Sequence, residues 1–342
     1  MRMPRPAHFA ALGLIVVALF GAGCTQAADP YLPMTTVFPA SDWGKQIQDL
    51  YVLLFWMALV VFVGVEGFLL YAILRFRRRR DNELPSQVHG NTRLEVTWTV
   101  LPSLVLLVIA VPSMATIFSS YTLPASASDA LKVRVIGHQW WWEYQYPELG
   151  VTTANELHLP LGRTAIFELE SIDVIHSFWI PRMGGKIDAV PSHTNHMWFT
   201  PQETGEFLGQ CVEFCGTQHA NMRLRAFVQT EADFNAWVQG QRAAAAEPTA
   251  GLVQRGADLF QGSACIGCHT IRGTKAQGTV GPDLTHVGSR TTIAAGILDN
   301  TPQNMKRWVQ NPQGVKVGAK MPNLNLTDAD ATAIAAYLLS LK

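Results

Sequence analysis

The sequence predicts a multidomain chain: a hairpin of two membrane-spanning helices, then an all-β domain, then a separate C-terminal unit. Three observations predict this order. Two apolar stretches near the N-terminus are each long enough to cross a bilayer. Short runs of alternating polarity over residues 131–237, punctuated by Gly and Pro, are typical of a sandwich or barrel. A tether over residues 241–250 then leads to a unit with its own cysteine motif.

Composition limits the class of protein. The 342 residues hold 26 Lys and Arg against 26 Asp and Glu, so no basic footprint for nucleic acid is present in the overall charge. A disulfide framework would favour an even number of cysteines in a short chain. This chain has five, each in a local pattern of its own: Cys24, Cys211, Cys215, Cys265 and Cys268.

The balanced total hides an asymmetry between the two non-membrane parts. Residues 125–240 carry 7 basic and 13 acidic side chains, a formal charge of −6. Residues 251–342 carry 9 basic and 5 acidic side chains, a formal charge of +4. Opposite signs on two tethered units predict that they dock on each other. Two unrelated surface charges are the alternative.

The first 24 residues have the layout of a signal peptide. Arg2 and Arg5 precede an apolar run over residues 10–20, which is too short to span a bilayer stably. The small residues that end at Cys24 resemble a bacterial lipoprotein processing site, although Gly21 stands where a larger apolar residue is usual. Ordinary signal cleavage, which would leave a free thiol, is the alternative.

Within residues 25–122, two spans are predicted, over about residues 50–74 and 96–118. The arginine-rich run over residues 75–80 lies between them and should remain in the cytoplasm. A nucleic-acid patch is the rival interpretation, but a basic run next to a span usually sets topology. The sequence therefore predicts a hairpin with both ends outside the cytoplasm and everything after Phe118 on the outer side.

A short segment of the predicted β domain concentrates metal-binding side chains. Cys211, Cys215, His219 and Met222 fall within twelve residues, and two thiolates, an imidazole and a thioether suit a soft redox metal such as copper. A mononuclear blue-copper site needs only one Cys, so two thiolates can instead bridge two coppers. Each copper then needs an imidazole, and His176 near an upstream strand provides a second one.

These residues and their spacing resemble the dinuclear CuA motif of cytochrome c oxidase subunit II. The resemblance implies a cupredoxin-like sandwich or barrel over residues 125–240. A structural disulfide between the two cysteines is the alternative, but it leaves the His and Met spacing unexplained. The implied ligands are bridging Cys211 and Cys215, terminal His176 and His219, weak axial Met222 and the Glu213 backbone carbonyl, with the Glu213 carboxylate on a Mg²⁺ shared with subunit I.

Two further positions match the same family. The aromatic run that contains Trp140 matches the segment where electrons enter over CuA, whereas Trp141 and Trp142 are expected to be packing residues. Glu95, at the start of the second span, matches a carboxylate near the mouth of a proton channel into subunit I. A carboxylate that only stabilises a helix start is the alternative for Glu95.

The C-terminal unit carries Cys265-x-x-Cys268-His269, the motif for covalent haem c attachment. A thioredoxin-like redox pair is the alternative, but no βαβ pattern surrounds the motif. His269 is expected as one axial iron ligand and Met321, in a loop before a predicted helix over residues 327–341, as the other. His286 is the chemical rival of Met321. The unit resembles an all-α class I cytochrome c, covering residues 251–342.

The resemblance covers nearly the whole mature chain and implies one function. Electrons from a soluble cytochrome c or a cytochrome bc complex would reach haem c, then CuA, then subunit I, where dioxygen becomes water with proton translocation. Subunits I and III would be partners in a bacterial plasma membrane, and high salt would slow transfer between the docked units. A membrane-anchored copper-delivery or assembly protein, and a free-standing electron shuttle or sensor, are the alternatives.

Overall fold

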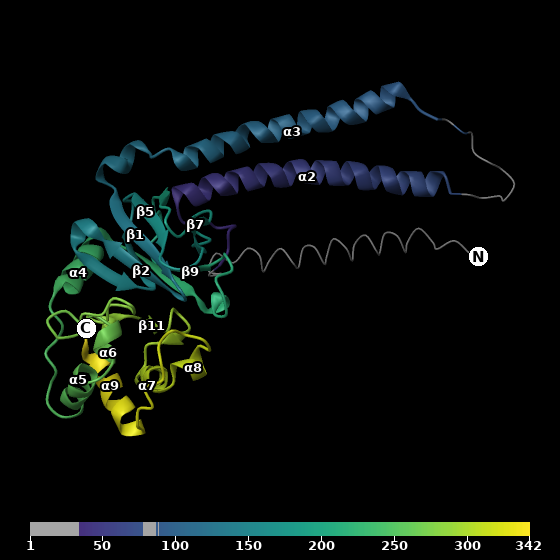
Figure 1. Ribbon diagram of the computed structural model, residues 1–342. Helices are drawn as coiled ribbons and strands as arrows, with labels where there is room; N and C mark the ends of the chain where they lie inside the picture. The colour runs from purple at the N-terminus through teal and green to yellow at the C-terminus, as the bar shows by residue number, and fades with distance from the viewer. Residues whose placement is uncertain (1–33, 78–86, 88) are drawn as a thin grey trace, which may run out of the picture.

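The computed structural model describes residues 34–77, 87 and 89–342, and Figure 1 shows three parts in a row. A helical hairpin lies at one end, a β-sandwich in the middle and a small, mostly helical domain at the other end. The signal peptide and processing site predicted over residues 1–24, Cys24 included, lie outside the described residues. So do residues 78–80 of the predicted cytoplasmic arginine run.

The hairpin consists of α2 (Asp42–Arg75) and α3 (Thr92–Tyr121), which run side by side in Figure 1. Each contains an 18-residue stretch of high mean hydropathy, 2.4 in α2 and 2.3 in α3, and their exposed apolar side chains are those of bilayer-spanning helices. Helices α2 and α3 are longer than the apolar stretches predicted over about residues 50–74 and 96–118. Side-chain caps at Ser41 and Asn91 satisfy backbone N–H groups of the first turns, so the helices begin earlier, in polar sequence.

The first turn of α2 anchors the hairpin to the sandwich. The Trp43 side chain is buried against Gly184, where a Cβ atom would come within 2.5 Å of the indole ring. Gly184 also has a φ of +150°, a conformation that residues with side chains rarely adopt. The Ser41 hydroxyl donates a hydrogen bond of 2.6 Å to the carbonyl of Met183. The membrane helices are thus joined to the β domain by a packed contact.

The sandwich has two five-stranded sheets, with strand orders β3-β2-β1-β5-β8 and β4-β10-β9-β6-β7. Strands β1 and β5 pair in parallel, as do β4 and β10, and the other pairs are antiparallel. The strands are β1 (Leu131–His138), β2 (Trp141–Tyr146), β3 (Val151–Ala154), β4 (Glu156–Pro160), β5 (Ala165–Ser171), β6 (His176–Trp179), β7 (Ile187–Ala189), β8 (Asn195–Phe199), β9 (Gly205–Cys211) and β10 (Arg223–Gln229).

Alternating side chains along the strands fill the space between the sheets. On β2, Trp142, Tyr144 and Tyr146 are fully buried while the residues between them are half-buried. The Trp142 and Tyr144 rings pack against Phe178 of the facing sheet, which also contacts Phe167, and aromatic burial of this extent dominates a core. The period of two that predicted an all-β domain is therefore confirmed.

A helix that the sequence did not predict follows the last strand. α4 (Glu231–Arg242) begins at Thr230, whose hydroxyl accepts a hydrogen bond from the N–H of Asp233. Phe234 and Val238, four residues apart, are buried against the sandwich core. The apolar spacing in this segment is helical, whereas the predicted pattern treated residues up to 237 as part of the β domain.

The C-terminal domain is mainly helical, as predicted. Thr327 caps its last helix, with its hydroxyl accepting from the N–H of Asp330 at 3.1 Å. One two-residue strand pair departs from an all-α fold. The elements are α5 (Leu252–Gln261), α6 (Cys265–Cys268), β11 (Thr292–Ile293), β12 (Leu298–Asp299), α7 (Pro302–Gln310), α8 (Pro312–Val315) and α9 (Asp328–Ser340); short 3₁₀ turns in the chain are Ala125–Asp129, Pro147–Leu149, His219–Asn221 and Val287–Ser289.

Gly256→Ala tests the packing of α5 on α9. A Cβ atom at Gly256 would collide with the carbonyl oxygen of Ala333, so the helices must separate. We expect a loss of about 1–3 kcal/mol in the stability of this domain. Hydrogen exchange of the purified full chain should rise in peptides from α5 and α9. The control Gly240→Ala, at an exposed glycine with open space, should leave exchange unchanged; equal protection in both variants would contradict the packing argument.

Candidate metal centre and haem cavity

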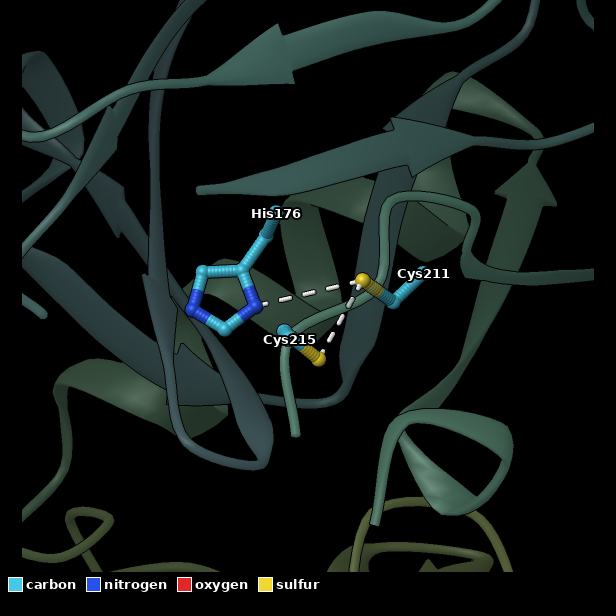
Figure 2. Close-up of side chains that lie close together, drawn as sticks. All are labelled: His176, Cys211 and Cys215. Carbon is cyan, nitrogen blue, oxygen red and sulfur yellow. Dashed lines mark hydrogen bonds between the residues drawn. The ribbon is translucent and has the colours of Figure 1, made fainter. Parts of the chain in front are cut away.

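Antiparallel pairing of β6 with β9 brings the first two metal-binding side chains together. Cys211 ends β9 and lies opposite Phe178. His176 begins β6, two residues before Phe178, so its side chain points to the same face. The Cys211 Sγ atom lies 3.9 Å from Nδ1 of His176, and Figure 2 shows this ring facing the two sulfur atoms.

The loop after β9 turns back over the same pocket. The N–H of Cys211 donates to the carbonyl of Met222, 2.9 Å away, which closes the loop. Within it, Cys215 Sγ lies 3.7 Å from Cys211 Sγ and 3.5 Å from Nδ1 of His219. The Sδ atom of Met222 lies 3.9 Å from Cys215 Sγ, and Met222 is fully buried.

The arrangement of donors is nearly symmetric. Cys211 has the imidazole of His176 on one side and the backbone carbonyl of Glu213, 3.3 Å away, on another. Cys215 correspondingly has an imidazole and a thioether. The sulfur atoms are too far apart for an S–S bond of about 2.05 Å, and both thiols are free. Two thiols, each with its own imidazole and one weak donor, fit a pair of soft metal ions such as copper.

The two thiols are electrostatically coupled. A hydrogen bond from Cys215 lowers the pKa of Cys211 to about 4, with burial opposing this effect and His176 adding to it. The same contact raises the pKa of Cys215 well above its usual range, because a second negative charge this close is unfavourable. Cations between the sulfur atoms would remove that repulsion, so the pair favours metal binding over two free thiolates.

A half-buried carboxylate orients His176. Oδ1 of Asp173 lies 2.9 Å from Nε2 of His176, which directs Nδ1 toward the sulfur atoms. Burial alone would raise the pKa of Asp173, but hydrogen bonds from His176, from the N–H groups of Val174 and Gln139, and from Lys320 hold it well below its usual range. The carboxylate is therefore charged, and Lys320 reaches it from the C-terminal domain at 3.1 Å.

Trp140 lies directly against the loop over residues 211–222, called the metal loop below. Its Nε1 donates a 2.9 Å hydrogen bond to the carbonyl of Cys215. Gly216, at a φ of +114°, allows this approach, because a Cβ atom there would come within 3.1 Å of the indole ring. Trp142 is fully buried in the sandwich core. Trp141 is half-buried, stacks on His138 with 3.9 Å between ring centroids, and also lines the cavity described below.

Glu95 makes a local hydrogen bond at the start of its helix. It lies in the first turn of α3, and its carboxylate accepts a 3.1 Å hydrogen bond from the N–H of Asn91. The side chain is exposed in the single chain. The first turn of α3 lies at the end of the hairpin away from the sandwich, as Figure 1 shows.

The C-terminal domain contains a cavity of about 420 Å³, within the range of cofactor sites. Cys265, Cys268 and His269 lie in its wall together with mainly apolar side chains. Nδ1 of His269 lies 2.8 Å from the carbonyl of Pro282, which fixes the ring and makes Nε2 the atom for binding iron. Burial lowers the pKa of His269, so the imidazole is neutral, as an iron ligand must be.

The structure separates the candidates for the second axial ligand. Met321 and Met305 both line the cavity. His286 is buried, but its Nε2 faces the carbonyl of Ala243 at 3.1 Å, outside the cavity wall as the structure describes it. Of the three candidate side chains, the two methionines therefore line the cavity and His286 does not.

The cavity wall is completed by the sandwich. Trp140, Gln139 and Asp173 line it alongside the residues of the haem motif.

Sequence reasoning missed Asp173, although an Asp three residues before a predicted ligand is a usable signal for a supporting hydrogen bond. It also missed Lys316 and Glu156, because single charged residues that become buried only between domains leave no local pattern.

Three family models match successive parts of the chain. The transmembrane domain of cytochrome c oxidase subunit II matches residues 35–116, the periplasmic domain of the same subunit matches residues 149–228, and cytochrome c matches residues 253–342. These segments correspond to the hairpin, the sandwich and the C-terminal domain.

Relatives match over nearly the full length. Cytochrome c oxidase subunit 2 of Alkalihalophilus pseudofirmus is 38% identical, with 97% of this chain and 96% of the relative covered. The Bacillus subtilis protein of the same name is 34% identical, with 96% of each covered. That of Bacillus sp. (strain PS3) is 35% identical over 78% of this chain and 80% of its own. A copper-binding fold, a haem motif and this similarity agree, so the chain belongs to the cytochrome c oxidase subunit II family, in the form with a C-terminal cytochrome c domain.

Proposed function

We propose that this chain accepts electrons through haem c in the C-terminal cavity and passes them by a dinuclear copper centre to subunit I of the oxidase, where dioxygen is reduced to water with proton translocation. One observation carries the proposal: both cofactor sites lie on one chain and share a wall at Trp140. Membership of the family supports the partnership with subunit I.

The copper ligands in this proposal are bridging Cys211 and Cys215, terminal His176 and His219, and weak Met222 and the Glu213 carbonyl. When bound, the copper pair supplies a one-electron carrier whose charge is shared between two metals. The chain fixes the donors on a strand end and a closed loop, which limits reorganisation of the ligands. Burial of both thiols also protects them from oxidation.

The haem-binding residues in this proposal are Cys265 and Cys268 for the covalent bonds, and His269 and Met321 for the iron. A thioether opposite a histidine raises the reduction potential of a haem. Trp140 then stands between the two sites, with its indole N–H on the carbonyl of a bridging cysteine. In this proposal, Trp140 is the residue through which electrons enter the copper centre.

The same proposal assigns the remaining parts. The hairpin crosses a bacterial plasma membrane, with the arginine run inside and both cofactor domains on the outer side. Subunits I and III are partners, and a soluble cytochrome c or a cytochrome bc complex is the donor. The Glu213 carboxylate would bind Mg²⁺ at the contact with subunit I, and Glu95 would lie at the mouth of a proton channel.

Cys211→Ser tests the copper assignment. Because a hydroxyl cannot bridge two soft ions as a thiolate does, we expect the purified protein to lose copper and its mixed-valence absorption. Metal analysis and optical spectroscopy measure both. The matched control Cys265→Ser should keep the copper signals and lose one of the two covalent bonds to haem. Unchanged copper content and spectrum in Cys211→Ser would refute the metal centre.

Met321→Leu tests the axial ligand. Loss of the thioether should lower the haem reduction potential and change the axial-ligand absorption, which potentiometric titration and optical spectra record. Met305→Leu removes the other methionine of the cavity and should leave both properties close to those of the parent. The reverse pattern would transfer the axial role to Met305.

A further inference from the structure

Two buried charged side chains lie at separate points of the contact between the sandwich and the C-terminal domain. Lys316 follows α8 and Glu156 begins β4, and each is 3% exposed. We propose that these residues form a latch that holds the C-terminal domain permanently docked, with its haem cavity against Trp140. The inference rests on the proposed function and adds to it two residues that position the haem for electron transfer to copper.

Lys316 inserts from the C-terminal domain into the rim of the metal loop. Its Nζ donates to the carbonyls of Trp140 and Asn221, both at 2.7 Å, and to the carbonyl of Ala294 at 3.3 Å. An ammonium group has three donors, so this site satisfies all of them. Trp140 and Asn221 belong to the sandwich, and Asn221 precedes the predicted copper ligand Met222. Lys316 thereby fixes the C-terminal domain on the loop that holds the metal.

Glu156 provides the second point, with the charges reversed. Its Oε1 accepts from the N–H and the hydroxyl of Thr291, at 2.8 and 2.7 Å, and from the same two groups of Thr292, at 2.9 and 3.2 Å. Arg290, which is half-buried and next to Thr291 in the chain, adds a positive charge that interacts with the Glu156 carboxylate. The sandwich thus inserts a carboxylate into the C-terminal domain.

The two contacts select one docked position. A buried charge is tolerated only where hydrogen bonds satisfy it, and in this register both Lys316 and Glu156 have them. The short tether over residues 243–250 keeps the domains at a high effective concentration, so even modest contact energy favours the docked state. The two buried contacts thus determine the position in which the domains dock, and the short tether raises the fraction of molecules that are docked.

In this docked position, the loop that contains Lys320 and Met321 lies next to the proposed copper ligand His176 and its partner Asp173. Lys320, next to Met321, pairs with Asp173, and Asp173 holds His176. Salt will screen the Lys320 side chain, which is 56% exposed, but will screen the buried Lys316 and Glu156 much less. The structure therefore favours a weaker salt effect on transfer between the domains than the charge asymmetry of the sequence predicts.

The test uses Lys316→Met, Glu156→Ala and the double variant in the complete oxidase. The rate of electron transfer from photoreduced haem to copper should fall about tenfold or more in the double variant, because small displacements of a positioned group are costly. Copper content, haem content and both spectra should stay unchanged. Lys275→Met and Glu231→Ala make the same changes of charge at exposed positions and should transfer electrons at the parent rate.

Hydrogen exchange gives a second readout that does not depend on the cofactors. Peptides with residues 155–158 and 289–293 should exchange faster in the latch variants, while α9 remains protected. A double variant with a parent-like rate or parent-like exchange would overturn the latch. Absence of haem-to-copper transfer in the parent would refute the proposed function instead, and exchange would still decide the latch. Thr292→Val, which removes one donor to Glu156, provides a milder variant that should show the same changes to a smaller degree.

Discussion

The pairing of β6 with β9 is the constraint on which the metal centre depends, because it alone sets His176 beside Cys211. A slip of one residue would turn the imidazole to the opposite face of the sheet. Two glycines make the register possible. A Cβ atom at Gly209 would lie 2.6 Å from the carbonyl of Trp179, and one at Gly137, in the other sheet, 2.6 Å from the His176 ring. His176, the proposed copper ligand, therefore occupies a narrow space that larger side chains at these two positions would fill.

Local sequence was sufficient for the membrane hairpin, the β domain and the two cofactor motifs, because each depends on periodicity or on ligands close together in the chain. The residues that connect these parts could not be predicted in the same way. Lys316 and Glu156 become buried only when two folded domains meet, and α4 forms because Phe234 and Val238 find a sandwich to pack on. Family similarity over 97% of the chain removes the copper-delivery alternative, which the cysteine motif alone had left open.

The opposite net charges of the two domains favour their contact, but the individual hydrogen bonds determine its geometry. The opposite signs of the two parts predicted docking, and the contact contains the ion pair of Lys320 with Asp173 as well as the buried Glu156 of the sandwich and Lys316 of the C-terminal domain. Yet Glu156 and Lys316 do not pair with each other. Lys316 is satisfied by carbonyls and Glu156 by threonine donors, so the contact requires a particular backbone geometry and not merely an opposite field. Such contacts determine position more than they determine affinity.

The same reasoning extends toward the membrane. Trp43 packs on Gly184 at the start of α2, and the Ser119 hydroxyl donates to the side chain of Gln46, which holds α3 to α2 near the sandwich. The orientation of the hairpin thus fixes the sandwich, and the buried contacts of Lys316 fix the C-terminal domain on the sandwich. A chain that delivers electrons to a partner in the membrane needs constant distances between its carriers. Packed contacts at each junction provide them, whereas a flexible linker at any one junction would make the distance variable.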